Sequence, residues 1–180
     1  TLFRSERCLA FNDEIGSIEI LQGNDRRIYQ REPLTLLGEK ARLIPVSVSS
    51  PSGACLASYT VASVADGAVV VAVLGKDGAG IYQIEFGATV PKLFMAFPLF
   101  GTEGIRLPGV LNSHRFWPKK DRDGLYLGQE KTEYNLANKG LVEQACPLFL
   151  MLLRLCASSN WKGIERLCHV TKSEPIRGID

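Results

Sequence analysis

The spacing of apolar residues predicts β-strands in the first third of the chain. Residues 18–20 alternate with polar neighbours, and strand character resumes at residues 28–29 after the turn Gln22-Gly23-Asn24-Asp25, which is the pattern of a β-hairpin. A further strand is predicted over residues 41–48. Residues 55–64 are rich in β-branched and aromatic side chains and favour another strand, although their alanines leave a helix open.

The middle of the chain predicts a buried hairpin. Residues 68–74 are almost all valine and alanine, which is typical of a strand buried on both faces, and residues 81–86 alternate as the return strand. The glycine-rich segment 75–80, Gly-Lys-Asp-Gly-Ala-Gly, could also cradle a phosphate with its backbone amides. A phosphate loop should open a helix, whereas this segment leads into a strand, so a hairpin turn is favoured.

A long amphipathic helix is predicted near the C-terminus. Asn138 is the expected N-cap, Ser158-Ser159-Asn160 is the expected end, and Pro147 should kink the helix or force a restart. Residues 161–170 could form a second short helix. The apolar stripe repeats at helical spacing over Leu141, Val142, Ala145, Leu148, Phe149, Leu152, Leu153 and Leu155.

Strands in succession followed by one long helix predict an α+β fold. We expect an antiparallel or mixed sheet with the helix packed on one face. At 180 residues, with 46% apolar and 22% charged residues, the chain can bury a core of ordinary size. Its formal charge of +2 makes nucleic acid an improbable partner.

The start of the chain and its apolar runs indicate whether the protein is secreted or inserted in a membrane. The first residue is Thr1, so the chain is expected to be a piece of a longer polypeptide, and no signal-peptide pattern opens it. The longest apolar run, 147–153, is short of the roughly 20 residues that a membrane span needs, so no membrane is expected.

The cysteine pattern favours a reducing compartment. The five cysteines form no close pairs, and no spacing typical of zinc ligands is present, including around Cys168 and His169. Cys146 and Cys156 fall in the helical pattern, where buried free thiols are expected. We therefore predict a cytoplasmic protein with no metal site of its own.

The most distinctive stretch is 91–127, in which a strand predicted over residues 92–100 is followed by a cluster of cations. On residue types alone this cluster has three interpretations: a solvated loop, an interface patch, or a loop that contacts an anion through an arginine fork. Asp121 and Asp123 could pair with the arginine between them. The side chains concerned are His114, Arg115, Lys119, Lys120 and Arg122.

Neighbouring residues in this stretch have interpretations of their own. Asn112 is read as a turn residue, and His114 as an exposed loop histidine rather than a general base. Glu103, after Gly101-Thr102, is typical of a turn. Trp117-Pro118 is expected to pack the loop down, with Trp117 as a weaker candidate for binding a client protein.

The same stretch resembles the segment that follows the ATP-binding domain in heat-shock-protein-90-like, sacsin-type ATPases. In that family a strand of the form K-L-F-x-x-x-P-L leads to L-P-x-x-x-N-x-x-F and then to an arginine-containing loop. The matching residues span about 40 positions and comprise Lys92-Leu93-Phe94, Pro98-Leu99, Leu107-Pro108, Asn112, Phe116 and Arg122-Asp123-Gly124.

The resemblance implies a transducer or middle domain that resembles the ribosomal S-five fold. In this superfamily of gyrase, heat-shock chaperone, histidine kinase and MutL, that domain extends a Lys or Arg to the γ-phosphate of ATP bound by the preceding domain. By position Arg122 is the candidate cation, with Arg115 and Lys119 behind it. ATP and Mg would be bound mainly by the domain that is not in this chain, whose nucleotide-binding signatures are missing from the sequence.

The implied organisation has three parts. Residues 1–32 would be the tail of the ATP-binding domain with a hairpin, 33–170 the transducer-type domain and 171–180 a polar tail. The expected partners are the ATP-binding domain of the same chain and a protein client, with a homodimer possible. The alternative is a non-catalytic protein-interaction module with a basic loop, and a weaker third idea is a small enzyme that uses segment 75–80.

Overall fold

Strand β6, Val69–Gly78, lies at the centre of the fold and is covered on both faces. Val71 and Val73 belong to one buried cluster, whereas the alternating residues Ala72 and Leu74 belong to another. Because successive side chains of a strand point to opposite faces, the apolar run of β6 requires a cover on each side of the sheet. The computed structural model describes residues 5–78, 81–85 and 90–167.

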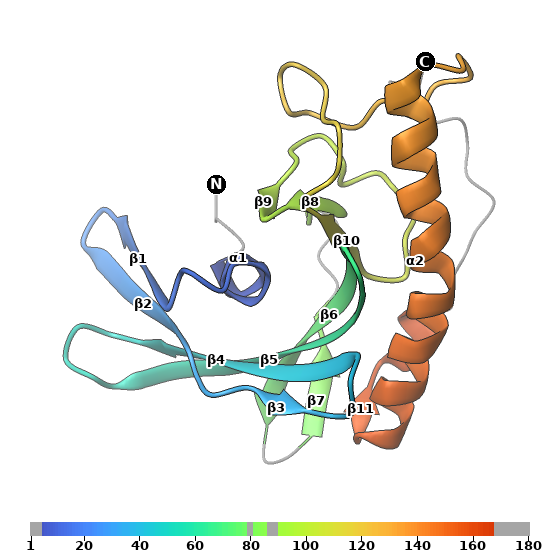
Figure 1. The fold of residues 1–180 in the computed structure, drawn as a ribbon. Helices are drawn as coiled ribbons and strands as arrows, with labels where there is room; N and C mark the ends of the chain where they lie inside the picture. The colour runs from blue at the N-terminus through green and yellow to red at the C-terminus, as the bar shows by residue number, and fades with distance from the viewer. Residues whose placement is uncertain (1–4, 79–80, 86–89, 168–180) are drawn as a thin grey trace.

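The described residues form a strongly curved mixed sheet (Figure 1). Its main order is β1-β2-β4-β5-β6-β10-β8-β9, with β3 beside β4, and with β7 between β6 and β11. The pairs β8–β10 and β7–β11 are parallel and the other pairs antiparallel. The other strands are β1 Ser17–Gln22, β2 Asp25–Arg31, β3 Thr35–Leu36, β4 Ala41–Ser49, β5 Cys55–Asp66, β7 Ile81–Ile84, β8 Leu93–Met95, β9 Phe97–Pro98, β10 Val110–Ser113 and β11 Trp161–Lys162.

Two helices supply the covers that β6 requires. Helix α2, Glu133–Ser158, packs on one face of the sheet through a stripe that includes Leu141, Leu148 and Leu152. Helix α1, Ser5–Phe11, lies on the other face, inside the curl of the sheet (Figure 1), and buries Cys8 and Leu9. The predicted α+β fold with a mixed sheet and one long packed helix is therefore confirmed.

Several strand predictions are confirmed, and two need correction. The β1–β2 hairpin, β4 and β5 form as expected, and β6 pairs antiparallel with β7. Residues 75–78 are still part of β6 rather than its turn, and Ala79-Gly80 lie outside the described residues. The expected single strand over 92–100 is instead two short strands, β8 and β9, because the chain turns at Ala96, whose φ is +61°.

The predicted limits of the long helix are partly wrong. Helix α2 begins at Glu133, with Thr132 as its N-cap: the Thr132 hydroxyl accepts a 3.2 Å hydrogen bond from the Asn135 amide. Asn138 is therefore not the cap. Pro147 lies inside one continuous helix and forces no restart. The predicted end at Ser158-Ser159-Asn160 is confirmed.

The second helix predicted over residues 161–170 is not formed by the described residues of that segment, 161–167. Strand β11 is followed by a single 3₁₀ turn, Ile164–Leu167, and residues 168–170 lie outside the described part. Trp161 packs its ring on Tyr82 of the neighbouring strand β7, with 4.9 Å between ring centroids. The segment therefore closes the lower end of the α2 face with a strand rather than a helix.

The N-terminal segment packs closely on the rest of the described chain. It forms helix α1, which the sequence did not predict, and Arg7 in this helix is 4% exposed. Because β2 pairs with β4, residues 25–31 belong to the same sheet as the rest of the chain. The division at residues 32 and 33 stays a prediction.

The four described cysteines are free thiols, but only two are buried. Burial raises the pKa of Cys8 to about 11 and that of Cys156 to about 12, so both thiols are neutral near pH 7. Cys146 is exposed on α2, which corrects the prediction that it is buried. Cys168 and His169 lie outside the described residues.

Helix α2 is long and apolar enough, by length and composition, to cross a membrane. Within its most apolar window the mean hydropathy is 1.5, and a third of the residues are buried. One such helix is weak evidence for a membrane span, since the core helix of a globular fold has the same composition. Its inner stripe packs against the sheet, and the absence of a membrane stays a prediction.

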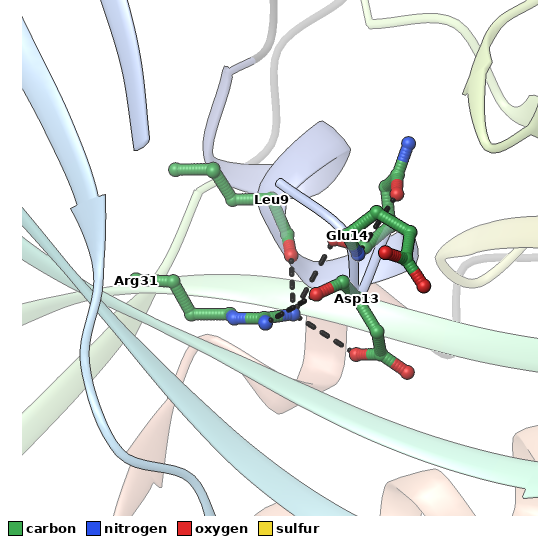
Figure 2. Close-up of polar contacts among 5 residues, drawn as sticks. Leu9, Asp13, Glu14 and Arg31 are labelled. Carbon is green, nitrogen blue, oxygen red and sulfur yellow. Dashed lines mark hydrogen bonds and ion pairs between the residues drawn. The ribbon is translucent and has the colours of Figure 1, made fainter. Parts of the chain in front are cut away.

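Arg31, at the end of β2, fastens α1 to the sheet (Figure 2). Its Nη1 atom donates to the carbonyl oxygens of Leu9 and Asn12 at 3.4 and 3.3 Å, and to Asp13 Oδ1 at 2.9 Å. Its Nη2 atom donates to the carbonyl oxygen of Asp13 at 2.8 Å. A cation on the last carbonyl groups of a helix also complements the helix dipole.

Replacing Arg31 should loosen α1. We expect Arg31→Met to lower the free energy of unfolding by about 2 kcal/mol, because hydrogen bonds from a partly buried charged group to backbone carbonyls are lost. Urea denaturation measures the change. Arg26→Met, on the same strand, is the matched control: among the described residues Arg26 forms an ion pair with the exposed Glu19 alone, so its loss should have little effect. Equal effects of the two substitutions would contradict the role given to Arg31.

Candidate functional site

The predicted cation cluster lies on a tight turn that we call the basic hairpin, residues 118–125. Pro118 and Leu125 form a β-bridge across its base. The Lys119 amide donates to the Gly124 carbonyl, and the Arg122 amide donates to the Lys119 carbonyl, both at 2.9 Å. Arg122 has a φ of +55°, the left-handed conformation that completes the turn at a cost for a non-glycine residue.

Asn138 of α2 holds the base of the basic hairpin. This side chain is fully buried, and its Oδ1 atom accepts from the Trp117 amide at 2.9 Å. Its Nδ2 atom donates to the Trp117 carbonyl at 2.9 Å and to the Tyr126 carbonyl at 3.0 Å. One amide therefore ties the residue before the hairpin and the residue after it to the same point on α2.

A second contact fixes the hairpin against the turn that follows β9. Gly101 has a φ of +87°, and a Cβ atom there would lie 2.7 Å from the Asp123 carbonyl oxygen, so only glycine admits this approach. The turn itself is held by buried Thr102, whose hydroxyl donates to the Leu99 carbonyl at 2.7 Å. The same hydroxyl accepts from the Leu93 amide at 3.2 Å.

Asn112 is a buried strand residue of β10 rather than the expected turn residue. Its Oδ1 atom accepts a 2.9 Å hydrogen bond from the Ala96 amide, which stabilises the left-handed turn between β8 and β9. The next residue, Ser113, accepts from the Arg115 amide at 3.2 Å and so shapes the exit from β10. Both polar side chains therefore act on the backbone around the site.

Further contacts tie the chain between the hairpin and α2 to that helix. Asn135 donates to the Glu130 carbonyl at 2.8 Å, and Lys139 donates through Nζ to the Gly128 carbonyl at 2.7 Å. The ring centroid of Tyr134 lies 4.9 Å from that of Trp117 and 6.1 Å from that of Tyr126. The predicted packing role of Trp117 is thus met in part, since its side chain remains 50% exposed.

The structure separates the predicted cations into two places. Arg122 lies exposed on the basic hairpin, and Lys119 is half-buried there. Arg115 is also exposed, but it lies beside a groove that neither of the other two lines. No ion pair joins Arg122 to Asp121 or Asp123, so the pairing considered from the sequence is not present among the described residues.

The groove beside Arg115 has a volume of about 590 Å³ and is open to solvent. It runs between the end of β8, the segment that leaves β10 and the first turns of α2. Its lining is mostly apolar and carries no carboxylate. The residues are Met95, His114, Arg115, Phe116, Trp117, Pro118, Ala137 and Leu141. His114 is exposed, as predicted.

Sequence reasoning missed the residues that position the site. Asn138 was assigned to a helix cap, although Thr132 followed by Glu133 was a local signal for a start six residues earlier. The role of Gly101 had no such signal, because it depends on the approach of Asp123, which is distant in sequence. Within the described residues no group of three or more His, Cys, Asp or Glu side chains could hold a metal ion.

The fold and this site define the chain as an α+β protein that presents a clamped basic hairpin beside an apolar groove. Comparisons of the chain with protein-family models, with curated proteins and with solved structures each found no match. The resemblance to heat-shock-protein-90-like ATPases therefore rests on the residues quoted from the sequence.

Substitution of Asn138 should free the basic hairpin from α2. We expect Asn138→Ala to lower the free energy of unfolding by about 2–4 kcal/mol, because a fully buried side chain is truncated and part-buried backbone groups of Trp117 and Tyr126 lose their partners. Hydrogen exchange of the Trp117 amide should also quicken more than exchange in β6. Gln144→Ala, at an exposed position of the same helix, is the control. Unchanged exchange at Trp117 would show that Asn138 does not hold the hairpin.

Proposed function

We propose that this chain is the transducer or middle domain of a heat-shock-protein-90-like, sacsin-type ATPase. In this proposal the basic hairpin supplies a cation to the γ-phosphate of ATP bound by a preceding domain, and Arg122 is that cation. ATP and Mg²⁺ are bound by the preceding domain, and hydrolysis is coupled to movement between the two domains. The resemblance to an S-five-like transducer, cytoplasmic location and dimerisation belong to the same proposal.

The observation that carries the proposal is an exposed arginine on a hairpin that is fixed at two points. The guanidinium of Arg122 is not neutralised by the carboxylates on either side of it. Asn138 fixes the base of the hairpin, and the Gly101 turn fixes the backbone at Asp123. A cation held in place before the reaction stabilises developing phosphoryl charge without paying for its own ordering.

The basic hairpin is linked to the N-terminal helix α1 through a short series of contacts. Helix α1, the first described element, contacts β9, and the turn after β9 carries Gly101, which touches the hairpin. In Figure 1 the gold segment between β10 and α2 lies at the top of the view, above α1. In this proposal the preceding domain docks at the edge formed by α1, β9 and the Gly101 turn.

In the proposed reaction this chain supplies a single cation to the transferred phosphoryl group. During phosphoryl transfer, negative charge spreads over the oxygens of the transferred group, and an arginine can stabilise it through two parallel N–H donors. A lysine at the same place supplies charge but lacks the planar fork. Lys119 and Arg115 are the other candidates for this role; Arg115 lines the groove, whereas Arg122 does not.

Loss of Arg122 should reduce ATP turnover by the full-length protein. We expect Arg122→Ala to lower kcat by about 10³-fold or more, with nucleotide affinity nearly unchanged, because the cation acts on charge that develops in the transition state. Arg122→Lys should restore part of the rate. Steady-state turnover and nucleotide titration measure the two quantities, and Lys120→Ala, at an exposed hairpin neighbour, is the control.

Other outcomes would assign the role of the γ-phosphate cation to another residue or overturn the proposal. A large fall in kcat for Arg115→Ala or Lys119→Ala, with Arg122→Ala unaffected, would move the role to that residue. A full-length protein that turns over no ATP, or unchanged turnover in all three variants, would overturn the proposal.

A further inference from the structure

The groove beside Arg115 has the composition of a protein-binding surface. Trp117, which lines the groove, is 50% exposed, and Tyr134, whose ring packs on that of Trp117, is 46% exposed. Large exposed aromatic side chains together with arginine are the residue types that contribute most to binding at protein interfaces. Their gathering beside an open apolar groove distinguishes this place from scattered surface residues.

The charge of the groove selects the kind of partner. His114 and Arg115 are its polar lining residues, and no carboxylate is among the lining. Arg115 forms no ion pair with any described residue. An apolar side chain that enters the groove next to an Asp or Glu would therefore gain both burial and a charge partner, whereas a basic segment would be repelled.

The groove is also prepared for binding before a partner arrives. Asn138 fixes the backbone of Trp117 through two hydrogen bonds of 2.9 Å. Ala137 and Leu141 are one turn apart on α2, so the floor of the groove is a regular helix face. Rigid walls lower the entropy cost of association, because the partner alone must be ordered.

We propose that this groove binds an acidic, apolar peptide segment of a partner protein. Apolar side chains of the segment pack over Ala137 and Leu141, the wall is formed by Trp117, and a carboxylate pairs with Arg115. A methylammonium ligand fits less well, because Trp117 and Tyr134 pack on each other and leave no cage between their rings. This inference does not depend on whether Arg122 reaches a phosphate.

The test is a selection of random 12-residue peptides displayed on phage against the full chain. The enriched peptides should combine Leu, Phe or Trp with Asp or Glu, and synthetic copies should bind in a fluorescence-anisotropy titration. Ala137→Phe, which fills the groove, and Arg115→Glu, which reverses its charge, should each weaken binding about tenfold or more. Copies in which Lys replaces Asp and Glu should bind as weakly.

Matched changes on the far end of α2 give the controls. Ala157→Phe and Arg154→Glu, both at exposed positions, should leave the affinity unchanged. If Ala137→Phe does not fold, Arg115→Glu at an exposed position still tests the charge requirement.

Several results would overturn this proposal. They are a selection that enriches no peptide, one that enriches basic peptides, and binding that is indifferent to both groove variants. A full chain that is dimeric by sedimentation and becomes monomeric on Ala137→Phe would assign the groove to a second copy instead. None of these results bears on kcat, so failure here is distinct from failure of the proposed role of Arg122.

Discussion

The burial of β6 on both faces is the constraint on which the rest of the structure depends. A strand whose Val71 and Val73 face one side and whose Ala72 and Leu74 face the other is stable only between two covers. Helix α2 covers one face through its own long apolar stripe. Helix α1 covers the other face, but with seven residues it is too short to be stable alone. Its docking therefore needs the polar contacts of Arg31.

The same use of polar groups explains how a hairpin can be both exposed and fixed. Few side chains of the basic hairpin are buried, so apolar packing alone contributes little to its position. Its order comes from backbone groups: Asn138 takes up three of them at the base, and the Gly101 turn lets the chain at Asp123 approach closely. Because the buried amide of Asn138 is costly to leave unpaired, it holds these backbone groups and so fixes the base of a turn whose tip is in water.

Local periodicity was enough to predict the elements that the structure confirms. The β1–β2 and β6–β7 hairpins and the stripe of α2 are encoded by neighbouring residues, and the fold class follows from their order. The misses involve residues whose role is set by distant partners. Asn138 lies 21 residues from Trp117 in sequence, and Arg31 lies 22 from Leu9. Helix α1 was missed as well: it is seven residues long and contains the charged residues Glu6 and Arg7, so it carries little apolar periodicity.

The hairpin and the groove share one boundary, and this has a mechanical consequence. Pro118 lines the groove and also begins the hairpin, while Trp117 is the wall of the groove and is bonded to Asn138. Displacing the backbone of Trp117 would break its two hydrogen bonds to Asn138. Asn138 is therefore a shared anchor of the groove wall and of the basic hairpin.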